Sequence, residues 1–157
     1  MARITAATYK PQLQFRFQMS IDKLPNSLYY LKSSDLPIMS NNSIEIDYGN
    51  TSFHVKGKTR WNKLNCTMYA YEGMTYSELF EWANLHHFIS SGTDLYKEDY
   101  EVGLIQLQLM KPSNTPVNTV KLHNAYLDEI NYGQVDWSSN EPITPSMTIV
   151  YDYATIT

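Results

Sequence analysis

The chain of 157 residues has a single cysteine, Cys66, and few glycines and prolines, six and seven respectively. One cysteine excludes an internal disulfide framework and predicts a reducing compartment. The low glycine and proline content, with many aromatic residues, excludes a collagen-like or disordered chain. No apolar run approaches the ~20 residues of a membrane helix, and the first ten residues lack the apolar segment of a signal peptide. We therefore expect a cytoplasmic protein without a membrane anchor.

The chain also lacks a net positive charge. Lysine and arginine number 12 against 16 aspartates and glutamates, so the formal net charge is −4. Wrapping of nucleic acid depends on many lysine and arginine contacts to phosphates, and this composition argues against it. The balance is compatible with a protein that lies beside DNA without binding it.

Sequence motifs of catalysis are also missing. We find no glycine-rich phosphate loop, no paired-cysteine metal site and no nucleophile elbow. His86 and His87 are adjacent, so on a helix they point about 100° apart and cannot bind one metal ion together. Glu45 and Asp47 share a strand face, where acidic pairs are far more often plain surface than catalytic groups. We predict no catalytic residue, no cofactor and no metal site, and therefore not an enzyme.

What the chain does contain is strand-like alternation. Leu13, Phe15, Phe17 and Met19 alternate with polar residues, which predicts a half-buried antiparallel strand. A second strand is expected over residues 27–33, and the turn residues between the two strands predict a hairpin.

A second predicted hairpin turns at Gly49 and Asn50, between apolar positions that alternate with polar ones. This pattern predicts one apolar face and one polar face, the polar face carrying Glu45, Asp47, His54 and Lys56. A connection containing Thr59, Arg60, Trp61 and Asn62 should lead to the next strand.

Further strands are expected over residues 63–71, 102–110, 117–124 and 146–153. Cys66 should point inward as a small buried residue. Gln106 and Gln108 should lie on a polar strand face. In the last strand, Met147, Ile149, Tyr151 and Tyr153 should share one face.

One helix is expected between these strands, from Thr75 to Ser90. Thr75 and Glu78 have the spacing of a capping box, and Gly92 suits the end of a helix. Apolar or aromatic side chains recur at three- and four-residue spacing and should face the sheets: Leu79, Trp82, Ala83, His86 and Ile89.

About seven to nine strands and one helix predict a mainly β fold. We expect two antiparallel sheets in a sandwich or partly closed barrel, with the helix at about residues 75–90 on its flank. The length suits a single domain over residues 1–157, with residues 1–11 as an N-terminal arm.

The last third of the chain carries a family resemblance. Val120–Leu127 is followed by Glu129 and Ile130, then by Val135-Asp136-Trp137-Ser138-Ser139-Asn140-Glu141, and then by Met147–Tyr153. This order resembles the tail tube protein of T4-type contractile-tailed bacteriophages, which shares its fold with type VI secretion tube proteins. The strands and the helix before it agree in order and length, so the likeness covers about residues 12–153. Ser138 stands where the family has an acidic residue, and the usual proline before Val135 is missing.

The resemblance implies a structural virion protein assembled in the host cytoplasm. Six copies would form a ring, and stacked rings would form the inner tail tube through which phage DNA passes without specific binding. Sheath, baseplate and tube terminator proteins are the implied partners. The polar strand faces become candidate lumen surface: Glu45, Asp47, His54, Lys56, Gln106 and Gln108. Candidate contacts between rings or subunits are Thr59, Arg60, Trp61 and Asn62, together with the arm.

Two kinds of alternative stay open at this stage. Within the same fold family, the chain could be a baseplate tube initiator or a type VI secretion tube protein. From another class, an aromatic-rich β-sandwich could bind glycans by stacking sugars on tyrosines or on Trp61. An exposed aromatic is more often part of a core or a subunit interface than of a sugar site.

Overall fold

The computed structural model describes residues 12–22, 31–71, 75–84, 87–88, 93–94 and 103–157. The chain is mainly β, with antiparallel sheets and one helix in these ranges, as predicted. No sheet closes into a barrel within the described ranges, so the sandwich form of the prediction holds. The expected arm, residues 1–11, lies outside them.

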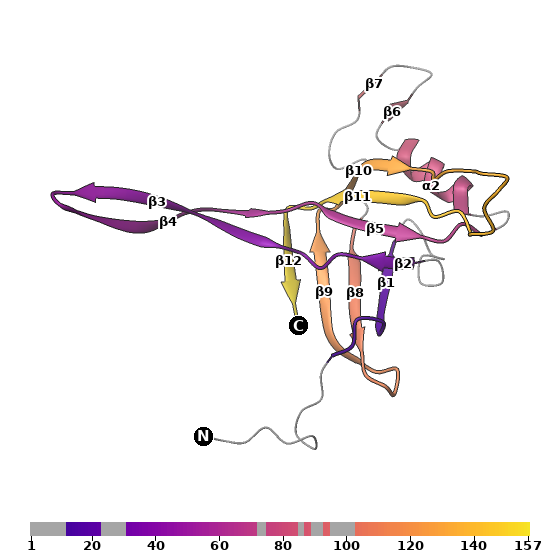
Figure 1. Ribbon diagram of the computed structural model, residues 1–157, viewed down its shortest axis with the longest axis horizontal. Coiled ribbons are helices and arrows are strands. Elements are labelled where there is room, and N and C mark those ends of the chain that lie inside the picture. The colour runs from indigo at the N-terminus through magenta and orange to yellow at the C-terminus, as the bar shows by residue number, and fades with distance from the viewer. Residues whose placement is uncertain (1–11, 23–30, 72–74, 85–86, 89–92, 95–102) are drawn as a thin grey trace.

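Two four-stranded sheets form the body of the protein (Figure 1). The first sheet has the order β1-β8-β9-β12, and the second has the order β10-β11-β5-β2. The strands of the first sheet are β1 (Phe17–Ile21), β8 (Ile105–Met110), β9 (Pro116–His123) and β12 (Tyr153–Ile156). Those of the second are β2 (Leu31–Ser34), β5 (Leu64–Met68), β10 (Tyr126–Asn131) and β11 (Ser146–Val150).

Two smaller ladders contain the remaining strands of the described residues. The long hairpin consists of β3 (Met39–Tyr48) and β4 (Thr51–Trp61), and the short one of β6 (His87–Phe88) and β7 (Thr93–Asp94). Residues 59–61 thus belong to β4, so the prediction that Thr59, Arg60 and Trp61 lie in a connection is wrong. The apolar and polar alternation simply continues for longer than the sequence pattern suggested.

The predicted first hairpin is also wrong. β1 pairs with β8 and β2 pairs with β5, so the two strands belong to different sheets. A turn signal predicts a change of direction but not the partner strand. The partner is decided by burial, since Met19 and Ile21 enter the core beside Leu107 and Ile105 of β8.

The single α-helix of the described chain, α2 (Thr75–Asn84), begins at the predicted residue. Leu79 and Trp82 are fully buried and Ala83 packs against the core, as its spacing predicted. The predicted end at Ser90 is wrong, because the next two described residues form β6. Asn84 is a weak helix former, and the strand pairing that follows competes with another helical turn. His86, Ile89 and Gly92 lie outside the described residues.

One hydrophobic core joins both sheets and the helix. The first sheet contributes Met19, Ile21, Ile105, Leu107, Val120 and Leu122, and the second contributes Leu64, Cys66, Met68, Leu127, Met147 and Ile149. Inward positions alternate with polar ones along each strand, which is the pattern of a two-sheet sandwich. Cys66 is buried, as predicted.

Two of the connections that carry the chain from one sheet to the other are only two residues long. Asn124 and Ala125 join β9 to β10, and Tyr151 and Asp152 join β11 to β12. The φ of Asn124 is 53°, a left-handed value that asparagine tolerates better than most residues. The two crossovers are tied together, because Asn124 Nδ2 donates to Asp152 Oδ2 at 2.9 Å and the Asp152 amide donates to the His123 carbonyl at 3.1 Å.

The second crossover corrects the predicted last strand. Met147, Ile149 and Tyr151 are buried on one face, but Tyr153 belongs to another strand in the other sheet and is partly exposed. Continuous alternation in the sequence hid a break that only the packing of two sheets explains.

Candidate assembly surface

The β3–β4 hairpin projects as a long arm away from both sheets (Figure 1). Its tip is a two-residue turn, Gly49–Asn50, in which Gly49 has a φ of 62°. A positive φ at the first turn position is what a type II′ hairpin turn requires, and glycine adopts it without strain. Thr51 Oγ1 also donates to the Tyr48 carbonyl at 3.2 Å.

One face of the hairpin is apolar and exposed. Ile44 lies opposite Val55, and Ile46 lies opposite Phe53. Tyr48, at the tip, is 78% exposed, and the other four are also exposed. We call Ile44, Ile46, Tyr48, Phe53 and Val55 the hairpin apolar face.

The other hairpin face carries the predicted polar set. Glu45 lies directly opposite His54, Asp47 opposite Ser52, and Lys56 opposite Ser43. All of these side chains are exposed. The structure therefore brings together four of the six residues predicted to line a lumen.

Gln106 and Gln108, the other two predicted lumen residues, lie on β8 in the first sheet. Gln106 pairs with Ser20 and Lys121, and Gln108 pairs with Gln18 and Thr119. This outer face of the first sheet is polar and carries no acidic side chain in the strands that the structure describes. His123 stacks on Tyr153 in the same face, with ring centroids 4.4 Å apart, and its Nε2 lies 2.9 Å from Thr155 Oγ1.

The residues predicted to make contacts between subunits lie at the base of the hairpin. Trp61 is half-buried against the core, with its ring centroid 6.0 Å from that of Tyr151. Such a position suits an anchor for the hairpin better than a sugar platform. Thr59, Arg60 and Asn62 are exposed, and Thr59 Oγ1 donates to Asn41 Oδ1 at 2.7 Å. A role between rings stays a prediction for these residues.

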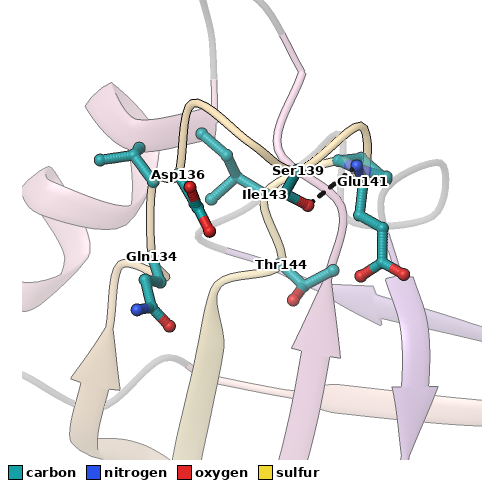
Figure 2. A pocket seen from close by; sticks show the side chains of 8 residues that line it. Gln134, Asp136, Ser139, Glu141, Ile143 and Thr144 are labelled. Carbon is teal, nitrogen blue, oxygen red and sulfur yellow. Dashed lines mark hydrogen bonds between the residues drawn. The ribbon is translucent and has the colours of Figure 1, made fainter.

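Sequence reasoning missed one surface element, the loop of residues 132–145 between β10 and β11. Trp137 is 107% exposed and Val135 is 80% exposed. Residues of this loop line a hollow of about 390 Å³, to which both polar and apolar side chains contribute. Figure 2 shows how these side chains lie, Asp136 and Glu141 among them. The motif containing Trp137 entered the family resemblance, but nothing in its spacing indicated that the indole would stand clear of the protein.

The described residues include no group of three or more metal-ligating side chains. Burial, and to a lesser degree the charge of Asp35, raises the pKa of the Cys66 thiol to about 12. A thiol of that kind stays protonated and inert near neutral pH. No helix in the described ranges is long and apolar enough to cross a bilayer.

No family model and no curated protein sequence matches the chain. Solved structures do match it. The structure of the anti-feeding prophage cap, a tube-terminating cap, aligns with a TM-score of 0.77 and 18% identity over 99% of this chain and 95% of the other. The sheath/tube terminator of the extracellular contractile injection system PVC aligns with a TM-score of 0.77 and 20% identity over 96% and 99%.

A chain of the PVC sheath–tube complex aligns over 99% of both chains, with a TM-score of 0.75 and 18% identity. The present chain therefore has the same fold as chains of these contractile injection systems. Hcp1 from Flavobacterium johnsoniae aligns less closely, with a TM-score of 0.58 and 17% identity over 90% and 94%. The predicted likeness to the tube-protein fold family is therefore confirmed at the level of fold.

Proposed function

We propose that this chain is a structural tube subunit whose copies assemble into stacked hexameric rings. In this proposal the tube is the inner tail tube of a contractile phage, and DNA passes through its lumen. The hairpin apolar face carries the proposal. It is a continuous apolar strip on an arm that lies away from the core, and surfaces of that kind mark sites of protein association.

The match to tube proteins supports the same role for a second reason. It runs over nearly the full length of this chain and of the compared chains, so the likeness involves the whole fold. Sheath, baseplate and terminator proteins are the partners that a tube subunit would meet. The protein would then reside in the virion after assembly in the host cytoplasm.

The outer face of the first sheet is the best candidate for the lumen. This face is polar. Among the strand residues that the structure describes there, the basic side chain is Lys121, and none is acidic. A wall of neutral polar groups would let a polyanion slide, whereas a wall rich in lysine and arginine would hold its phosphates. Of the predicted lumen residues, Gln106 and Gln108 belong to this face, and Glu45, Asp47, His54 and Lys56 would reach a lumen only through the hairpin.

The deciding experiment is negative-stain microscopy of the purified protein, with its mass in solution measured by sedimentation. We expect hexameric rings or hollow tubes. Replacing two residues of the hairpin apolar face, Ile46→Ser with Phe53→Ser, should abolish assembly, because it removes the apolar area that association buries. The subunit should remain folded, since neither side chain belongs to the core.

A matched double variant replaces two residues of the opposite hairpin face, Asp47→Ser with Lys56→Ser, and leaves the net charge unchanged. It should assemble nearly as well as the unmodified protein. A protein that stays monomeric at all concentrations, even with a preformed tube seed, would contradict a tube role. Rings that form but never stack would instead indicate a baseplate initiator or a terminator.

A further inference from the structure

Trp137 and Val135 form an apolar tip on the loop of residues 132–145. Trp137 is as exposed as in an extended chain, and Val135 is nearly so. A tryptophan is the residue type that contributes most often to the centre of a protein interface, where it fills a pocket of the partner. This tip is separate from the hairpin apolar face, on the connection between β10 and β11 (Figure 1).

Hydrogen bonds within the loop restrain the backbone around this tip. Asp136 Oδ1 accepts hydrogen bonds from the Ser138 amide at 2.9 Å and from the Ser138 hydroxyl at 2.8 Å. Ser139 Oγ accepts from the Glu141 amide at 3.2 Å (Figure 2). A segment ordered before binding loses little conformational entropy when it docks.

Both ends of the loop are also tied to the body of the protein. The Tyr76 hydroxyl donates to the Tyr132 carbonyl at 2.9 Å, and the Ala70 amide donates to the Ile143 carbonyl at 2.9 Å. At Gly133 a Cβ would lie 2.7 Å from Ile143 Cγ2, and its φ is 93°. The tip therefore rests on a fixed base, as an interface anchor requires.

A hollow of about 530 Å³ lies elsewhere on the surface, at the end of the first sheet where β8 turns into β9. We call it the Phe15–Lys111 hollow. Phe15 is 72% exposed, and the Arg16 guanidinium lies 5.2 Å from the centre of its ring. The hollow is lined by Phe15, Arg16, Phe17, Gln18, Met110, Lys111, Pro112 and Asn114.

The tip and the hollow are complementary in charge. The loop carries two acids, Asp136 and Glu141, and no lysine, arginine or histidine. The hollow carries Arg16 and Lys111 and no acid. The pKa of Asp136 is lowered mainly by the hydrogen bond from the Ser138 amide and also by the one from the Ser138 hydroxyl. Its carboxylate is therefore charged at neutral pH. Complementary charge around an apolar anchor favours one partner orientation and rejects others.

We propose that the Trp137 tip of one copy docks into the Phe15–Lys111 hollow of a second copy. The partner is this same chain, and the inference rests on the proposed function, in which copies must associate. Because tip and hollow are different surfaces, the contact is head-to-tail. Such a contact is heterologous, and its repetition either closes a ring or propagates a stack.

Sedimentation velocity of the full chain over a range of concentrations measures its self-association. It tests how much Trp137 contributes to the affinity between copies. Trp137→Ala should raise the dissociation constant at least ~10-fold, the effect of losing a hot-spot tryptophan. Phe80→Ala removes an exposed aromatic from α2 and serves as the matched control. It should leave association unchanged. Equal effects of the two variants would overturn the proposal.

Charge reversal tests the pairing itself. Glu141→Lys and Lys111→Glu should each weaken association, and the double variant should restore most of it, because the opposite signs meet again. Additive losses in the double variant would show that the two residues do not face each other.

Cross-linking tests the geometry independently of tube growth. Cys66 is buried, so it provides an unreactive background for engineered thiols. Val135→Cys and Pro112→Cys variants, mixed at high concentration and oxidised, should form a mixed disulfide dimer, while either variant alone should not. Dimers from Val135→Cys alone would indicate two tips back to back, and absence of the mixed dimer would overturn the proposal.

These readouts separate the inference from the proposed function. Tubes that form normally from the Trp137→Ala variant, without mixed cross-links, would refute the Trp137 contact and leave the tube role standing. A protein that never assembles, yet forms the mixed cross-link, would refute the tube role and keep the contact between copies.

Discussion

At the scale of the residue, the burial of Cys66 predicts a low reactivity of its thiol. Its side chain is buried between the sheets, and burial raises the pKa of the thiol to about 12. The native protein should therefore resist thiol reagents at pH 8, where an accessible thiol of ordinary pKa reacts readily. Labelling with such a reagent across a urea gradient should follow global unfolding. Labelling well before the unfolding transition would show that β5 opens locally.

The same thiol should make stability depend on pH in alkaline solution. The unfolded thiol loses its proton from about pH 9, whereas the folded thiol keeps it until about pH 12. Between these values the folded state binds more protons, so stability falls as pH rises, by at most about 1.4 kcal/mol per pH unit. Because lysines and tyrosines also titrate there, the measurement is the difference between the wild-type protein and Cys66→Ala. An identical pH slope in both would contradict the assignment.

Trp82 provides a second prediction at this scale. It is the largest fully buried side chain, and its Nε1 has no hydrogen-bond partner among the described residues. Trp82→Ala should lower the free energy of unfolding by about 3–5 kcal/mol, since it leaves a large cavity under α2. Trp82→Phe should cost clearly less, because it keeps most of the ring and removes an unsatisfied buried donor. Urea denaturation of the three proteins measures both, and equal losses would contradict the role of the orphan donor.

At the scale of the element, Gly57 controls the shape of the hairpin. The register of β3 and β4 shifts between Asn41 and Ser43, where the single β3 residue Asn42 faces two β4 residues, Gly57 and Lys58. A Cβ at Gly57 would lie 2.8 Å from the Asn42 carbonyl oxygen, a backbone atom that can give way only if the strand itself shifts. Gly57→Ala should therefore redirect the outer hairpin, since a bulge determines the local bend and twist of a strand.

The expected readout is selective. Assembly should fall, while the melting temperature of the subunit should change little, because the hairpin beyond the bulge contributes nothing to the core. Lys58→Ala, at the next and exposed position, is the matched control and should assemble normally. A large drop in melting temperature for Gly57→Ala alone would show that the bulge supports the fold itself.

At the scale of the whole molecule, local patterns predicted local structure well. Alternation over residues 44–56 predicted a hairpin with two distinct faces, and the start of α2 at Thr75 was correct. Partners distant in sequence were not predictable, because alternation is the same whichever strand lies alongside. That is why β1 and β2 were wrongly paired with each other.

Some of the candidate surfaces were predictable from the sequence and others were not. The polar and apolar hairpin faces followed from sequence alone, since register and alternation determine them together. The Trp137 tip did not, because nothing in a loop sequence distinguishes an exposed tryptophan from one folded back on the core. The half-buried position of Trp61, with its ring centroid 6.0 Å from that of Tyr151, was not predictable either, because the contact joins residues far apart in sequence.

The paired crossovers have a mechanical consequence. Asn124–Ala125 and Tyr151–Asp152 carry the chain between the sheets at one place, where the Asn124–Asp152 and Asp152–His123 hydrogen bonds join them. A force that slides one sheet past the other must load both covalent links and both hydrogen bonds at once. Elements loaded in parallel share the force, so the sandwich resists shear at this seam more strongly than a single link would. In the proposed tube, a load along the axis would then pass through each subunit without separating its two sheets.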